Sequence, residues 1–113
     1  METDRELLEL AAKAAGLSDY RYCDKRKCMI DCDVRAGSYM TPWIPLTDDG
    51  DALRLAVQLK LHISVQGDMP GDEQRTLCSH GGEGSKCQAH GTDAYAATRR
   101  AIVRCAAAIG RTM

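Results

Sequence analysis

The sequence lacks phenylalanine and holds one tryptophan and four tyrosines among its 113 residues. With so few aromatic side chains, a hydrophobic core must be built mainly from leucine, isoleucine, valine and alanine. The length corresponds to a single domain, 1–113, and 44% of the residues are apolar. The composition therefore indicates one domain with a modest aliphatic core.

The sequence also lacks any apolar run that approaches the roughly 20 residues needed to cross a bilayer. Acidic residues begin at Glu2 and no apolar segment follows, so the N-terminus does not resemble a secretory signal. We therefore expect a cytoplasmic protein with no membrane association, in which the six cysteines are reduced thiols. An even number of cysteines in a short chain also fits a disulfide framework, but only in a secreted protein.

Neither sign of charge is in excess, because 15 Lys and Arg stand against 16 Asp and Glu, a formal net charge of −1. General nucleic-acid binders are normally basic, so this balance argues against that function and is compatible only with a local basic patch. The sequence contains no G-x-S-x-G, no Walker phosphate loop and no H-E-x-x-H. These absences favour a protein that is not an enzyme.

An extended segment is expected near the middle of the chain. Pro42 and Pro45 bracket Trp43 and Ile44. Proline fixes its own φ and disfavours helical geometry in the residue before it. We therefore expect residues 41–46 to be extended, with Trp43 packed beneath the helix that follows.

That helix is predicted from several consistent signals. Thr47, Asp48 and Asp49 are each suitable as its N-cap, and Asp51 adds negative charge in the first turn. Apolar residues then recur at helical spacing, which predicts one buried stripe. The stripe comprises Ala52, Leu55, Ala56 and Leu59, and Leu53 and Val57 are expected to widen it.

After the helix, the hydrophobic period changes to two. Leu61, Ile63 and Val65 alternate with polar residues, which is typical of a half-buried strand. Weaker strand patterns follow the same reasoning, and the glycine-rich segment between the last two is expected to be a loop. Residues 20–32 and 38–41 are expected to pair as a loose hairpin, and residues 74–79 and 86–90 are expected to form two further strands.

A helix is predicted at the N-terminus. Thr3 and Glu6 form a capping box, in which the hydroxyl of Thr3 accepts from the amide of Glu6. Apolar residues then follow helical spacing, and Gly16 is placed to end the helix.

A second terminal helix is predicted near the C-terminus. Thr92 is expected to cap it, with Asp93 in the first turn, and Gly110 is expected to end it. Its apolar stripe is expected to comprise Tyr95, Thr98, Ile102, Cys105, Ala106 and Ile109. Together the patterns predict an α+β fold, a layered α/β/α sandwich with three helices and a small, mostly antiparallel sheet of three or four strands.

Two segments resemble a known family. The runs WIPLTDDGDALRLAVQLKL, from Trp43, and ATRRAIVRCAAAIGRTM, from Ala97, are similar to motifs of the phage ABA-sandwich domain family, and 1–16 fits its N-terminal helix. The resemblance covers roughly half of the chain, and residues 18–40 and 67–91 match poorly. It implies the layered fold and a non-enzymatic phage or prophage accessory protein that binds a host or phage protein in the bacterial cytoplasm. No reaction and no catalytic residue follow from it.

One candidate site is a set of zinc ligands. Two thiols and two imidazoles are a common tetrahedral zinc set. The set comprises Cys78, His80, Cys87 and His90. Its spacing, C-x-H followed by C-x2-H, differs from that of a zinc finger, and the alternative is reduced thiols in strands with solvent-facing histidines. This reading would make the protein a zinc-stabilised interaction module.

A second candidate site is a group of cations on the C-terminal helix. Arg99, Arg100 and Arg104, with Lys25 to Lys27, are suited to a small anionic ligand such as a nucleotide, because guanidinium groups match phosphate geometry. Such a protein would sequester a nucleotide or counter a host defence. The alternative is a solvated helix face whose arginines pair with acids of a neighbouring element. An exposed sheet edge is also compatible with a homo-oligomer.

Overall fold

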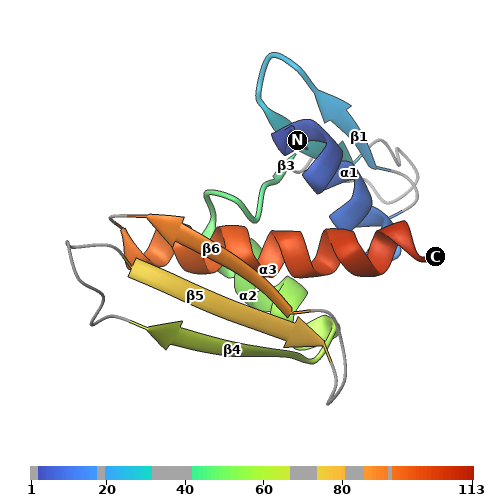
Figure 1. The fold of residues 1–113 in the computed structure, drawn as a ribbon. Helices are drawn as coiled ribbons and strands as arrows, with labels where there is room; N and C mark the ends of the chain where they lie inside the picture. The colour runs from blue at the N-terminus through green and yellow to red at the C-terminus, as the bar shows by residue number, and fades with distance from the viewer. Residues whose placement is uncertain (1–2, 18–19, 32–41, 67–73, 81–85, 92) are drawn as a thin grey trace.

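The computed structural model describes residues 3–17, 20–31, 42–66, 74–80, 86–91 and 93–113, with only the backbone at 31, 66, 74, 80, 86 and 91. This part of the chain forms three helices and six strands, which confirms the α+β class (Figure 1). In order they are α1 (Asp4–Ala14), β1 (Tyr20–Cys23), β2 (Cys28–Asp31), β3 (Pro42–Trp43), α2 (Asp49–Gln58), β4 (Leu61–Gln66), β5 (Gln74–His80), β6 (Lys86–Gly91) and α3 (Ala94–Arg111).

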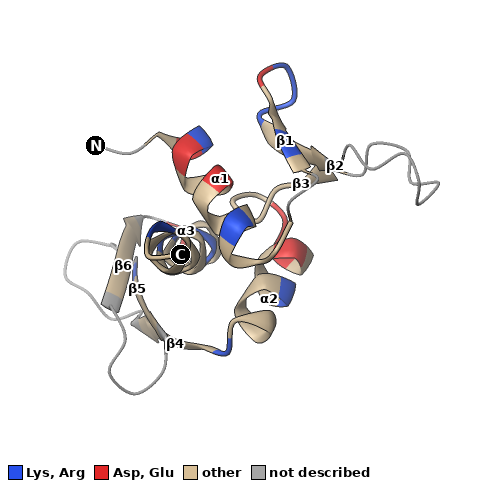
Figure 2. Ribbon diagram, turned by 90° about the vertical axis from the view of Figure 1, so that its right-hand side faces the viewer, with Lys and Arg blue, Asp and Glu red and all other residues tan. Residues whose placement is uncertain are grey.

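The strands form two antiparallel sheets where the sequence suggested one. Sheet A has the order β1-β2-β3 and sheet B the order β4-β5-β6. Figure 2 shows α3 and α1 between the two sheets, with sheet B against α3 and sheet A beyond α1. The helices separate the strands, so no ladder joins the two sheets in the described part. The segment 38–41, expected to pair in the first hairpin, lies outside the described residues.

Helix α1 begins as its capping box predicts. The Thr3 hydroxyl accepts a hydrogen bond from the Glu6 amide at 3.2 Å. Gly16 follows the helix with φ of 78°, the left-handed conformation expected of the residue after a helix. The buried side of α1 holds Leu7, Leu8, Ala11 and Ala12.

Helix α3 differs from the prediction at both ends. Its N-cap is Asp93, whose carboxylate accepts from the Tyr95 amide, and Thr92 lies outside the described residues. Gly110 does not end the helix, because α3 continues to Arg111. A Cβ at Gly110 would overlap the backbone carbonyl oxygen of Leu10 in α1. The glycine is therefore explained by the close approach of two helices.

The start of α2 is tied to the extended segment before it. Asp48 is the N-cap and accepts from the Asp51 amide at 2.8 Å. The buried carboxylate of Asp51 accepts from the Ile44 amide at 3.0 Å and from Arg54 Nη2 at 2.7 Å. Trp43 is half-buried in β3, where its ring contacts the core and lies edge-on to that of Tyr20. Trp43 therefore packs against the core and Tyr20, and its expected position beneath α2 stays a prediction.

Sheet B has one buried and one exposed face, as its alternating pattern predicts. Thr76, Cys78 and Ala89 are buried on the face toward α3. Ile63 is directly opposite Cys78 in the neighbouring strand, so it shares that face. The other face carries mainly polar residues. No described helix combines the length and apolarity required to cross a membrane.

Candidate functional site

The strongest candidate site is a groove bounded by α2, β4 and α3, which we call the α2–β4–α3 groove. Its volume is about 560 Å³. Most of its lining is apolar, and the polar groups are an aspartate, a threonine and an arginine. The lining residues are Asp49, Ala52, Leu53, Ile63, Val65, Ala94, Tyr95, Thr98, Arg99 and Ile102.

The apolar walls of the groove are open to solvent. Six large apolar side chains are exposed among the described residues, and four of them, Leu53, Ile63, Val65 and Tyr95, line this groove. Leu53 is 63% exposed and Tyr95 72%. Val57, four residues after Leu53 on α2, is exposed as well. Apolar residues gathered in this way mark a surface that another molecule covers.

This exposure corrects three expectations from the sequence. Ile63 and Val65, expected on the buried face of a half-buried strand, are 39% and 55% exposed. Leu53 and Val57 do not widen the buried stripe of α2, and Tyr95 does not belong to the buried stripe of α3. The buried face of α2 is limited to Asp51, Ala52, Leu55 and Ala56. Helical periodicity identifies the residues that lie on the side of a helix facing the protein. The width of the contact between that helix and its neighbours decides how many of those residues are buried.

The polar groups of the groove are already bonded within the protein. The Thr98 hydroxyl donates to the Ala94 carbonyl oxygen at 2.7 Å, so its single proton is used. Its contact of 2.9 Å with the Thr76 hydroxyl must therefore be donated by Thr76. At the same wall, Arg99 Nε donates to the Leu46 carbonyl oxygen and its guanidinium pairs with Asp49. These groups leave the groove suited to apolar side chains.

Strand β4 contributes backbone groups beside the groove. It is an edge of sheet B, with β5 as its only neighbour in the described part of the chain. Its residues, Leu61–Gln66, include no proline and no Asp, Glu, Lys or Arg. Edge strands are commonly protected by such residues. The edge of β4 therefore presents amide and carbonyl groups that no described strand pairs, next to an apolar wall.

The predicted arginine group is divided among three intramolecular contacts. Arg99 binds Leu46 and Asp49 near the start of α2. Arg100 pairs with Asp4 of α1 at 3.1 Å, and Arg104 donates to the Gln88 carbonyl oxygen at 2.8 Å. The three guanidinium groups therefore hold α3 to three different elements. An anion site at these arginines remains a prediction that no specific contact favours.

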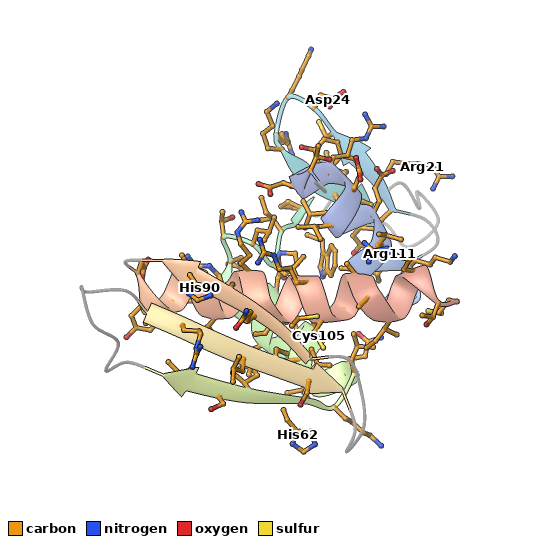
Figure 3. The ribbon with its side chains drawn as sticks, viewed as in Figure 1. Arg21, Asp24, His62, His90, Cys105 and Arg111 are labelled. Carbon is orange, nitrogen blue, oxygen red and sulfur yellow. The ribbon has the colours of Figure 1, made fainter. Side chains whose placement is uncertain are left out.

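The predicted zinc set is not assembled on one face of sheet B. Cys87 and His90 are three residues apart on β6 and so project from opposite faces. Cys87 packs against the core, whereas His90 is exposed, and Figure 3 shows it on the sheet away from Cys105. The side chain of His80 lies outside the described residues. In the described part, no three Cys, His, Asp or Glu residues are placed to hold a metal ion.

A cluster that the sequence analysis did not single out lies between sheet B and α3. Cys78 is opposite Cys87 in the ladder, and Cys105 of α3 is hydrogen-bonded to both thiols. The hydrogen bond that Cys105 donates lowers the pKa of Cys78. The hydrogen bond between Cys87 and Cys105 raises the pKa of Cys87 above the usual range. The bond to Cys78 raises the pKa of Cys105 to about 11. The directions fit a chain in which Cys87 donates to Cys105 and Cys105 donates to Cys78.

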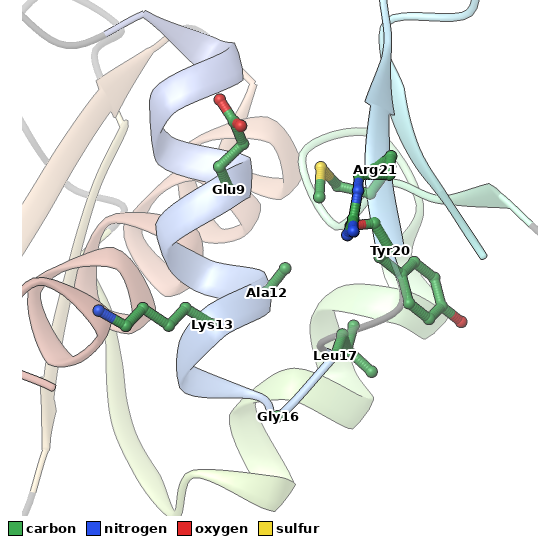
Figure 4. A pocket seen from close by; sticks show the side chains of 8 residues that line it. Glu9, Ala12, Lys13, Gly16, Leu17, Tyr20 and Arg21 are labelled. Carbon is green, nitrogen blue, oxygen red and sulfur yellow. The ribbon is translucent and has the colours of Figure 1, made fainter. Parts of the chain in front are cut away.

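A second cavity, of about 310 Å³, lies between α1 and β1. Its lining includes Glu9, Lys13, Tyr20 and Arg21. Figure 4 shows Lys13 pointing away from Tyr20 and Arg21, and its ammonium donates to the backbone oxygen of Met113 at 3.1 Å. The charged groups do not converge, so this cavity is a weaker candidate than the groove.

Comparisons of the chain with protein-family models, curated proteins and solved structures found no match. The fold and the geometry of the groove are therefore the basis for the class that can be stated: an α+β domain with an open apolar groove. The sequence contained one unused signal for this site. Large apolar residues at the margins of the predicted apolar faces of α2, β4 and α3 are exposed, namely Leu53, Val57, Ile63, Val65 and Tyr95.

Proposed function

We propose that this protein is a non-enzymatic binding protein that receives an extended apolar segment of a partner protein in the α2–β4–α3 groove. The observation that carries the proposal is the gathering of four of the six exposed large apolar side chains of the described residues around one groove. A single exposed leucine is ordinary on a protein surface, but a continuous apolar wall indicates a binding surface.

The free edge of β4 favours an extended partner over a helical one. A strand added to a sheet edge binds through main-chain hydrogen bonds, and its alternate side chains enter the adjoining pocket. Beside β4, those side chains would meet Ile63 and Val65 of sheet B and Leu53 of α2. The expected partner segment therefore has apolar residues at every second position.

The size of the apolar surface is sufficient for measurable affinity. Complete burial of one aliphatic side chain contributes roughly 1.5–3 kcal/mol, and the walls expose Leu53, Val65 and part of Ile63. Ordering a peptide offsets much of this gain, so a short isolated segment is expected to bind weakly. A full partner protein would add contacts outside the groove.

The biological setting of the proposal follows from the resemblance of residues 43–61 and 97–113 to the phage ABA-sandwich family. On that resemblance, we place the protein among phage or prophage accessory proteins that bind a host or phage protein in the bacterial cytoplasm. The contacts of Arg99, Arg100 and Arg104 within the protein give no support to a nucleotide or other anion as the ligand.

The proposal is tested with a synthetic peptide of alternating pattern, Lys-Val-Thr-Ile-Ser-Val-Lys, and a shuffled peptide of the same composition. Amide chemical shifts of ¹⁵N-labelled protein are recorded at peptide concentrations up to the millimolar range. The alternating peptide is expected to shift the amides of β4, Leu53 and Tyr95, whereas the shuffled peptide produces much smaller changes. Equal shifts with both peptides, or shifts centred on the α1–β1 cavity, would overturn the proposal.

Matched variants on one strand separate the groove from the rest of sheet B. Ile63→Lys places a charge in the groove and is expected to weaken binding at least tenfold. Ser64→Lys places the same charge on the opposite face of β4 and leaves affinity unchanged. Light scattering of the unbound protein at the same concentration measures whether it is a dimer. A dimer formed through β4 would mean that the edge binds a second copy of this chain and not a different partner protein.

A further inference from the structure

Four of the five described cysteines stand in directly opposed pairs. Cys23 of β1 is opposite Cys28 of β2, and Cys78 of β5 is opposite Cys87 of β6. All five described cysteines are free thiols in the structure. Each of the two sheets therefore carries one cross-strand pair of thiols.

The ladder places each pair within reach of a disulfide. Opposed residues of antiparallel strands have Cα atoms about 4.5–5.5 Å apart and side chains on the same face. Disulfides are found at Cα separations of roughly 4.4–6.8 Å. Cys105 approaches the second pair from α3 instead, so no strand ladder fixes its backbone distance from either partner.

We propose that the two opposed pairs are sites of covalent modification, at which a low-molecular-weight disulfide such as oxidised glutathione forms the cross-strand disulfides Cys23–Cys28 and Cys78–Cys87. The inference rests on the strand register, which places the two cysteines of each pair directly opposite one another. It is independent of the α2–β4–α3 groove and of the partner that the groove receives.

The reaction is a thiol–disulfide exchange in two steps. A cysteine thiolate attacks one sulfur of oxidised glutathione, which forms a mixed disulfide and releases one glutathione thiolate. The opposed cysteine loses its proton and attacks the protein sulfur of that mixed disulfide, which releases the second glutathione thiolate. Two protein thiols are oxidised to one disulfide, one glutathione disulfide is reduced to two thiols, and solvent accepts and returns the protons.

The surroundings of the two pairs predict different rates. Cys23 of sheet A is half-exposed, so oxidised glutathione reaches its sulfur from solvent. In sheet B, Cys78 is 1% exposed, so oxidised glutathione has little access to it although the hydrogen bond from Cys105 lowers its pKa. The pair in sheet A is therefore expected to be oxidised first. In a compartment held reduced by glutathione, both pairs remain dithiols.

Digestion with trypsin places each of the four paired cysteines in a different peptide, so a linked pair of peptides identifies the disulfide. Trypsin places Cys23 in residues 22–25 and Cys28 in 28–35, and it places Cys78 in 76–86 and Cys87 in 87–99. Cys105 falls in a fifth peptide, 105–111. The full-length protein carrying Cys32→Ala is used, because Cys32 shares a peptide with Cys28.

The experiment incubates the folded protein with oxidised glutathione at pH 8, quenches with acid at intervals, blocks free thiols and maps the linked peptides by mass spectrometry. We expect peptide 22–25 linked to 28–35 first and 76–86 linked to 87–99 later, each with the loss of two hydrogens. Circular dichroism at each interval verifies that the protein remains folded. A sample in urea shows the pairing of an unfolded chain, which is expected to include links to Cys105.

Variants decide the role of the third thiol. Cys105→Ala is expected to retain the link between Cys78 and Cys87, and Cys87→Ala is expected to abolish it without affecting the link in sheet A. Predominant links to Cys105, glutathione retained on single cysteines, or no link in sheet B after overnight oxidation would overturn the proposal for Cys78 and Cys87. Absence of a link between peptides 22–25 and 28–35 would overturn it for Cys23 and Cys28.

Discussion

Helix α3 makes two contacts of opposite character with the other two helices. Against α1 it approaches so closely that Gly110 lies on the carbonyl oxygen of Leu10, with buried alanines such as Ala11 and Ala107 nearby. On the side of α2, the α2–β4–α3 groove separates large apolar side chains, including Leu53 and Tyr95. We refer to these as the closed side and the open side of α3.

The difference is explained by side-chain size and by the elements available to cover each side. Small residues let two backbones meet, whereas large residues hold elements apart and need a third element between them. Sheet B ends at β4 in the described part, and none of the described strands fills the space beside α2. The open side therefore contrasts with the close contact that α3 makes with α1 on its other side.

The largest expected effect is a difference in the loss of stability when two leucines of α2 are replaced by alanine. Leu55 is 2% exposed and faces the core, whereas Leu53 is 63% exposed on the open side. Leu55→Ala is expected to lower the free energy of unfolding by about 2–5 kcal/mol because it leaves a cavity. Leu53→Ala is expected to change it by less than about 0.5 kcal/mol. Urea unfolding measures both, and equal losses would show that the open side is part of the core.

The closed side is tested by enlarging its smallest residue. Gly110→Ala gains about 1 kcal/mol of helix propensity, yet the added Cβ meets backbone atoms of Leu10 that must move. Overpacking of this kind costs about 1–3 kcal/mol, and the rigid neighbour favours the upper part of that range. We expect a net loss of about 2 kcal/mol in urea unfolding.

The matched control for Gly110→Ala is Gly50→Ala in the first turn of α2. There an added Cβ lies 3.3 Å from the flexible ends of the Arg54 and Asp48 side chains. The change at Gly50 is expected to be neutral or stabilising. A Gly110→Ala protein as stable as its parent would contradict the close helix contact.

Substitution of two neighbouring arginines compares the polar contacts that α3 makes on its open side and on its closed side. Arg99 is mostly buried and donates to the Leu46 carbonyl oxygen at 3.0 Å while pairing with Asp49, whereas the pair of Arg100 with Asp4 is exposed. Arg99→Ala is expected to cost about 1.5 kcal/mol, because a charged donor and a carbonyl partner are lost. Arg100→Ala is expected to cost less than about 1 kcal/mol. Equal losses would indicate that Arg99 does not specifically hold α2 beside the groove.

The smallest expected effect is the alkaline response of the thiols beneath α3. The hydrogen bond to Cys78 raises the pKa of Cys105 from 9.0 to about 11 in the folded protein. Cys105 therefore contributes stability that is complete below pH 9 and is lost as the pH rises toward 11, because the unfolded chain releases its proton first. The lowered pKa of Cys78 acts in the opposite sense, whereas the raised pKa of Cys87 acts in the same sense as that of Cys105.

Urea unfolding between pH 8 and pH 10.5 tests this response in the parent protein and in Cys105→Ala. The parent is expected to lose stability over this range more steeply than the variant. Parallel curves would mean that the Cys105 thiol titrates alike in the folded and unfolded chains.

Much of the local structure was predictable because it depends on neighbouring residues. The N-cap at Thr3, the helix beginning near Asp48 and the strand from Leu61 are confirmed. The errors occurred where distant elements decide the outcome. Gly110 was interpreted as a helix end because its nearest partner, Leu10, is a hundred residues away in the chain. Leu53 was assigned to a buried stripe because periodicity carries no information on what covers it.

The sequence by itself determined the helices, the alternation of sheet B and the absence of an aromatic core, since these follow from backbone preferences and from which residues are apolar. Only the tertiary structure decided that the strands divide into two sheets, that α3 is closed on one side and open on the other, and that cysteines meet in opposed pairs. Those features depend on distances between elements remote in sequence. Such distances are set by the packing of the whole chain.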